Sequence, residues 1–170
     1  MVIELNRCIA SFFFLCICGI ANAQPAIYQD GVLSIPQGAV IVGDEPAYYT
    51  SIQLADDGAG NFRLLAAQPN HLVHIDSVDV LILESSPLQV QLGVSGYTSN
   101  PCVELLTPAV SRKDNVFTVV LAQSQSLLGP DVACIAVTDP FEIFISLDVL
   151  GLAAGTYTVR VNGVTVEFTF

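Results

Sequence analysis

Two histidines and a nearby aspartate are the residues best suited to bind a metal. His71 and His74 lie three positions apart, and Asp76 follows two residues later. In a strand, a spacing of three places two side chains on opposite faces, so only a helical turn would bring both imidazoles to one ion. The surrounding segment, 68–77, has no helical pattern and is interpreted as a connector. We therefore expect no metal and no cofactor.

An acidic turn and a serine loop offer the remaining chemistry. The stretch "DDGAGN" (56–61) supplies oxygen donors for Ca²⁺ but lacks the spacing of an EF-hand loop, and a hairpin turn explains the same letters. The stretch "GVSGY" (93–97) resembles a nucleophile elbow, but its second glycine is one position early. Paired carboxylates for sugar hydrolysis stay open, because such pairs meet only in the fold. We expect no catalytic residues and no enzyme.

The first 23 residues have the features of a secretory signal peptide. Arg7 precedes an apolar run over 8–20, which ends in a small-x-small motif. Cleavage is expected between Ala23 and Gln24. The apolar run is shorter than the roughly 20 residues that span a bilayer, and its cysteines follow large residues, which disfavours lipidation without closing the question. We therefore expect a periplasmic or secreted protein.

Charge and cysteine content narrow the partners and the redox compartment. The chain of 170 residues has a net charge of −11 at pH 7, which disfavours nucleic acid and anionic lipid as partners. After loss of the leader, Cys102 and Cys134 remain, an even pair in an exported chain. We expect them to form a disulfide, which would contribute roughly 3 to 4 kcal/mol to stability in the chain-entropy model.

Apolar residues alternate with polar ones along most of the chain, which indicates half-buried strands. Clear examples are 88–94, 117–121 and 141–147. The last sixteen residues predict a hairpin, in which Asn162 and Gly163 supply the positive-φ positions of a type I′ turn.

These strands group into two parts. Residues 24–68 are expected to form a small N-terminal β-meander, and residues 78–170 an antiparallel β-sandwich of seven or eight strands. The expected strands of the sandwich include "CVELLT" (102–107) and "CIAV" (134–137). The predicted fold class is therefore all-β, with an immunoglobulin-like sandwich.

Two stretches resemble known proteins. The run "PFEIFISLDVLGLAAGTYTVRVNGVTVEFTF" (140–170) resembles the ends of immunoglobulin-like sandwich domains in exported bacterial proteins. The piece "GVLSIPQGAVIVGDEPAYYTSIQL" (31–54) is similar to a small β-element of bacterial envelope proteins. The chain departs from true immunoglobulin domains, since it has no Trp and its two cysteines lie closer in sequence than the usual pair. The resemblance implies no catalytic residues.

We therefore expect an exported, non-enzymatic binding or structural protein of the bacterial cell envelope. Its ligand would be a protein or a glycan, and the expected contact residues are Tyr48, Tyr49 and Tyr97, the last in the loop "YTSNP" (97–101). We expect a monomer that does not insert into membranes.

Three alternatives stay open. One is a small secreted hydrolase, and another is a protease inhibitor that presents a loop. The third is an outer-membrane β-barrel, which is disfavoured because the final strand, 164–170, has seven residues where a spanning strand needs roughly 9 to 11.

Overall fold

The computed structural model describes residues 25–42, 45–125 and 133–170. The expected signal peptide and its cleavage site at Ala23 and Gln24 lie outside the described residues. The described chain forms eleven strands and no helix, which confirms the predicted all-β class. Consequently, none of its segments is a helix long and apolar enough to cross a membrane.

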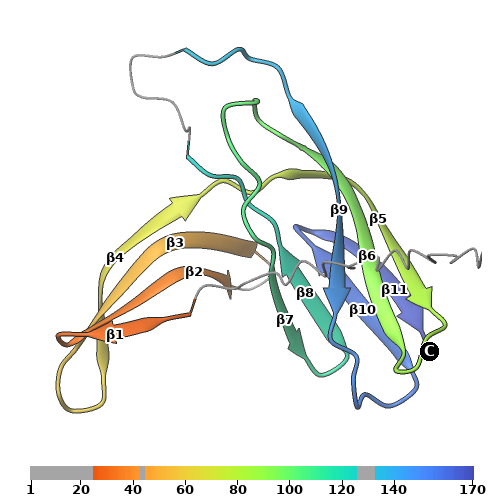
Figure 1. Ribbon diagram of the computed structural model, residues 1–170, viewed down its shortest axis with the longest axis horizontal. Coiled ribbons are helices and arrows are strands. Elements are labelled where there is room, and N and C mark those ends of the chain that lie inside the picture. The colour runs from red at the N-terminus through yellow and green to blue at the C-terminus, as the bar shows by residue number, and fades with distance from the viewer. Residues whose placement is uncertain (1–24, 43–44, 126–132) are drawn as a thin grey trace, which may run out of the picture.

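The N-terminal part is a four-stranded antiparallel meander that extends away from the rest of the molecule (Figure 1). Its strand order is β1-β2-β3-β4. Asp30 and Gly31 join the first two strands and both have positive φ, as a tight hairpin turn requires. The bounds are β1 (Ile27–Gln29), β2 (Val32–Val42), β3 (Glu45–Asp56) and β4 (Phe62–Asn70).

The C-terminal part is a sandwich of two sheets. The first has the order β5-β6-β9 and the second β11-β10-β8-β7, in which β8 and β10 run parallel and the other pairs antiparallel. The bounds in the first sheet are β5 (His74–Leu83), β6 (Gln89–Thr98) and β9 (Asp139–Leu147). Those in the second are β7 (Ala109–Lys113), β8 (Val116–Val120), β10 (Thr156–Val161) and β11 (Val164–Thr169).

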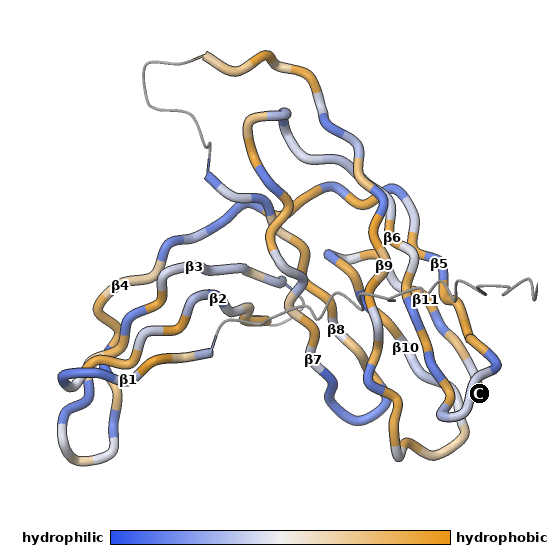
Figure 2. Tube along the Cα trace, in the orientation of Figure 1, coloured by the Kyte–Doolittle hydropathy of each residue, from blue (hydrophilic) through white to orange (hydrophobic). Residues whose placement is uncertain are grey.

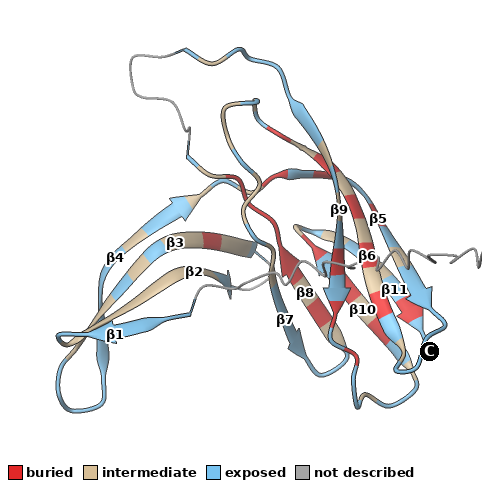
Figure 3. Cartoon of the chain, viewed as in Figure 1, coloured by how far each residue is buried: buried red, intermediate tan, exposed pale blue. Residues whose placement is uncertain are grey.

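The hydrophobic core lies between the two sheets of the sandwich. Alternate residues point inward and are buried, among them Val90, Leu92 and Val94 on β6 and Val159 and Val161 on β10. The N-terminal sheet contains apolar stretches as well (Figure 2), yet it is mostly half-buried or exposed (Figure 3). Hydrophobic burial is roughly proportional to apolar area removed from water, so the sandwich supplies most of this stabilisation.

Three local expectations were wrong. Residues 102–107 and 134–137 form no strand, and Ile135 is 66% exposed. The first run pairs with residues 122–124 only through an isolated bridge between Leu105 and Gln123, which is too short to extend into a strand. The expected connector 68–77 is largely strand, because β4 continues to Asn70 and β5 begins at His74.

The two parts meet where β3 packs on β8. Tyr48 is buried there with Val120 and Ala122. Its hydroxyl donates a hydrogen bond of 2.7 Å to the carbonyl of Thr107. A buried tyrosine with its hydroxyl satisfied is a firm anchor, so this contact fixes the base of the N-terminal sheet.

Candidate functional site

A groove of about 510 Å³ separates the N-terminal sheet from the sandwich. One wall is the segment of β2 over 37–41, and the other is formed by Ala109, Val110 and Ser111 on β7 with Val120 on β8. Most of these residues are apolar, and Val110 is 43% exposed. The groove is therefore an accessible apolar surface between segments distant in sequence.

Two strand edges border this groove. β7 is the last strand of its sheet, and β1 pairs with β2 only over Val32–Ser34. Within the described chain, the remainder of β2 therefore has no strand on that side. A strand edge presents backbone N–H and C=O groups that can pair with another chain.

Basic residues lie at the end of β7, in a chain of net charge −11. Arg112 and Lys113 are both exposed there, and the Arg112 guanidinium donates to the carbonyl of Asp114. No described residue that lines the groove is a carboxylate. Asp114 follows them and is also exposed, and Asp148 lines one small hollow with Arg112, so the charges at this end of β7 are mixed.

A smaller hollow of about 290 Å³ adjoins the turn between β10 and β11. Ile41 and Pro46 face it from the N-terminal sheet, and Arg160 contributes from β10. Arg160 pairs directly with Thr165 on β11 and with Thr118 on β8, so a side chain with a hydroxyl group lies on each side of it.

The same turn connects three segments through one side chain. The amide of Asn162 donates to the carbonyls of Val73 (3.0 Å) and Leu121 (2.7 Å), and its Oδ1 accepts from the Leu121 amide at 2.9 Å. Asn162 and Gly163 both have positive φ, at 44° and 96°. Sequence reasoning identified the turn but not these bonds, because nothing local in an Asn-Gly pair indicates its distant partners.

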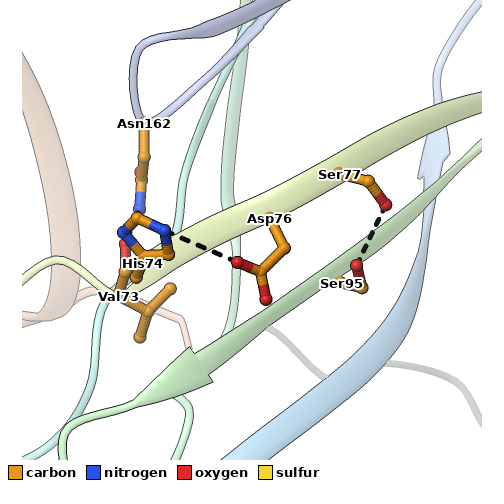
Figure 4. Close-up of polar contacts among 6 residues, drawn as sticks. All are labelled: Val73, His74, Asp76, Ser77, Ser95 and Asn162. Atoms are coloured by element: carbon orange, nitrogen blue, oxygen red, sulfur yellow. Dashed lines mark hydrogen bonds and ion pairs between the residues drawn. The ribbon is translucent and has the colours of Figure 1, made fainter.

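A polar group formed by His74, Asp76, Ser77 and Ser95 lies on β5 and β6 (Figure 4). The Nε2 of His74 lies 3.5 Å from Oδ1 of Asp76, and the His74 ring stacks on Tyr97 with centroids 4.6 Å apart. Ser77 and Ser95 share a hydrogen bond of 2.9 Å (Figure 4). The described residues contain no group of three potential metal ligands. His71 lies before β5, yet it lines one hollow of about 470 Å³ together with His74 and Tyr97, so the expected separation of the two histidines was wrong.

The acidic turn after β3 uses its carboxylates internally. Asp57 accepts from the amides of Ala59 and Asn61, and Asp56 accepts from the amide of Gly58 and from the Tyr28 hydroxyl. The Asn61 side chain also donates to Asp57, and it is the main cause that lowers the pKa of that carboxyl. These contacts fit a hairpin turn, since such carboxylates organise the turn backbone.

The three tyrosines expected to bind a ligand have different environments. Tyr48 is 1% exposed, so its assignment as a contact residue was wrong: its ring fills the junction described above. Tyr49 and Tyr97 are half-buried. The loop that follows Tyr97 is fixed by Gln123, whose side chain accepts from the Ser99 amide and donates to the Ser99 hydroxyl.

The predicted disulfide between Cys102 and Cys134 is confirmed, with Cα atoms 6.1 Å apart. It ties the loop after β6 to the segment before β9. Such bonds persist in oxidising compartments, so this one is consistent with an extracellular location.

Residues 92–170 match the family model of the ORF11 beta-sandwich domain. The match begins within β6 and continues to residue 170, so it includes the whole second sheet and, in the first sheet, β9 and most of β6, but not β5. It agrees with the sandwich architecture of this region. Comparisons of the chain with curated proteins and with solved structures returned no match. The matched residues include the β7 wall of the groove, whereas the β2 wall lies outside them.

Proposed function

We propose that this protein is an exported, non-enzymatic binding protein of the bacterial cell envelope, which binds an extended polypeptide in the groove between β2 and β7. The observation that carries the proposal is the pair of strand edges that border one apolar groove. The leader-like residues 1–23 and the disulfide between Cys102 and Cys134 support export to the periplasm or the medium.

The groove favours a polypeptide over a glycan. An added strand would pair its backbone with β7 and direct alternate side chains at the apolar wall. Its other wall, 37–41, would cover that strand from the opposite side.

The residues that line the groove and the smaller hollow beside the β10–β11 turn support binding rather than hydrolysis. No carboxylate and no histidine occurs among the described residues of either. General acid–base catalysis needs such a group within hydrogen-bond reach of the substrate. His71 and His74 line a third hollow with Tyr97 and Gln123, in which no described lining residue is a carboxylate.

Capture from the envelope fraction of the producing cells tests this function. The mature protein, the variant Val110→Lys and the control Phe144→Lys would be immobilised and compared. Phe144 is 61% exposed on β9, so its substitution makes the same charge change away from the groove. We expect one polypeptide to bind the wild type and the control but not Val110→Lys. Equal binding to all three, or hydrolysis of a substrate by the protein, would contradict the proposal.

A further inference from the structure

The sheet β5-β6-β9 has an outer face, which is turned away from the core of the sandwich. Val90, Leu92 and Val94 on β6 are buried in that core, so the residues between them point outward, because side chains alternate along a strand. Directly paired residues share one face, so the neighbours of these outward residues on β5 and β9 belong to the same surface. Four rows cross it in this way: Leu81 with Gln91 and Ser146, Asp79 with Gly93 and Phe144, Ser77 with Ser95 and Glu142, and His74 with Tyr97 and Pro140.

Phe144 presents an aromatic ring on this face. The residue is 61% exposed, and its ring leans over Gly93, since a Cβ on that glycine would lie 3.4 Å from Cε1 of Phe144. The glycine thus gives the ring room to lie against the backbone of β6 while much of it stays open to solvent. The face of an aromatic ring carries partial negative charge, and it attracts the C–H groups on the flat side of a pyranose, which carry partial positive charge. An exposed ring of this kind is a platform on which a sugar can stack.

The hollow of about 470 Å³ lies at the end of the same face, beyond β6. Its walls include His71 and the stacked ring pair of His74 and Tyr97. Gln123 lines it as well and is 6% exposed, and its side chain is held by the amide and the hydroxyl of Ser99. A primary amide has two N–H groups and a carbonyl with two lone pairs, so Gln123 can hold Ser99 and also bond a ligand hydroxyl. The hollow therefore combines flat rings with a positioned hydrogen-bonding group.

Polar groups occupy the surface between the hollow and the exposed ring. Ser77 and Ser95 share their hydrogen bond there (Figure 4), and Glu142 pairs with Ser95 from β9 and is exposed. From Gly93 to Tyr97 the strand advances by four residues, about 13 Å at roughly 3.4 Å per residue. That length exceeds a single pyranose ring, so a ligand that reaches both ends would be an oligosaccharide.

The charge of this face selects against acidic ligands. Asp79 and Glu142 are exposed on it, Asp76 lies beside His74, and the whole chain has a net charge of −11. A polymer of uronic acids or of sulfated sugars would therefore be repelled. Sugar hydroxyls, in contrast, donate hydrogen bonds to carboxylates, and such charge-assisted bonds are stronger than those between neutral groups. A neutral sugar is the ligand that these groups fit.

We infer that the outer face of β5, β6 and β9 binds a neutral oligosaccharide, which stacks one sugar ring on Phe144 and places another in the hollow beside Tyr97. Hydroxyl groups of the sugars between them would bond Glu142 and the paired serines. The sequence analysis named Tyr97 as a contact residue but not Phe144, because alternation along β9 does not show that a glycine of β6 lies under the ring. This surface is separate from the groove between β2 and β7, so the inference does not rest on the proposed function.

Isothermal titration calorimetry with soluble oligosaccharides tests this site. The neutral probes are linear oligomers of glucose, of N-acetylglucosamine and of mannose, and an oligomer of galacturonic acid is the acidic comparison. We expect at least one neutral probe to bind and the acidic one not to bind. Phe144→Ala should weaken that binding by about tenfold, because the stacking is lost, whereas Phe144→Tyr should retain it. His74→Ala should also weaken it, since this substitution removes half of the ring pair in the hollow.

Val110→Lys is the control, because it changes the groove and leaves this face intact. It should bind the sugar as the wild type does, so failure of the groove proposal and failure of this inference are distinguishable. Circular dichroism would establish that each variant retains its strands. Absence of binding to every neutral probe would overturn the inference, and so would equal affinity of folded Phe144→Ala and the wild type. Binding of choline or of a lysine-rich peptide in place of the sugars would also overturn it, because the carboxylates would then recognise a cation.

Discussion

Replacement of Asn162 by Gly should destabilise the fold more than any other change in a surface turn of the sandwich. The substitution keeps the turn, because Gly adopts positive φ freely, and removes only the side chain. That side chain makes three hydrogen bonds, to the carbonyls of Val73 and Leu121 and to the amide of Leu121. Each contributes about 1 kcal/mol, so the loss should be roughly 3 kcal/mol.

The assay is urea denaturation followed by far-UV circular dichroism, since the chain has no Trp for fluorescence. Asp30→Gly is the matched control, because Asp30 also has positive φ in a hairpin turn and is exposed. Its replacement should change the free energy of unfolding by less than about 0.5 kcal/mol. Equal effects of the two substitutions would refute the role given to the Asn162 side chain.

Three further predictions concern other contacts. Replacing both Cys102 and Cys134 by Ser opens a loop with a sequence separation of 32 and should lower the free energy of unfolding by roughly 3 to 4 kcal/mol, measured by urea denaturation; an unchanged midpoint would contradict it. Hydrogen bonds from Asn61 lower the pKa of Asp57. The stabilisation that they give the turn is therefore present above pH 3.8 and is lost as pH falls through the lower pKa of the folded state. Amide exchange at Ala59 should therefore accelerate below that pH in the wild type but lack this dependence in Asp57→Asn, and identical pH profiles would refute the assignment. Burial raises the pKa of Tyr48, so the stabilisation that its protonated side chain gives the fold is present below pH 10.0 and is lost as pH rises through the folded pKa. Tyr48→Phe should lose about 1 kcal/mol of unfolding free energy at neutral pH, and its melting temperature should fall less than that of the wild type as pH rises above 10.0.

Strands and turns with strong local signals were predictable from the sequence. Alternation over 88–94 corresponds to most of β6, and the Asn162-Gly163 pair lies between β10 and β11. The Asp30-Gly31 pair is an equally local signal that could have located β1. Features of this kind depend on φ preferences and on a two-residue period, which neighbouring residues determine.

The disulfide between Cys102 and Cys134 was predictable because two cysteines remain after the leader, but other features that depend on distant pairing were not. An alternating strand does not say which face will be covered, so Tyr48 was assigned to the surface although β8 buries it. The groove wall at Val110 and the hydrogen bond from Asn162 to Val73 arise from segments far apart in sequence. Their chemistry becomes visible only when the strand order is known.

The groove between β2 and β7 is the centre of this account, and photo-cross-linking tests it most directly. A photoreactive phenylalanine analogue would replace Val110 in the groove or, as the control, Phe144 on β9, in cells that export the protein. We predict a cross-link from position 110 to one contiguous segment of a partner polypeptide, mapped by mass spectrometry, and none from position 144. The same adducts from both positions, or no polypeptide adduct from position 110 in correctly folded protein, would contradict the claim that this groove binds a strand.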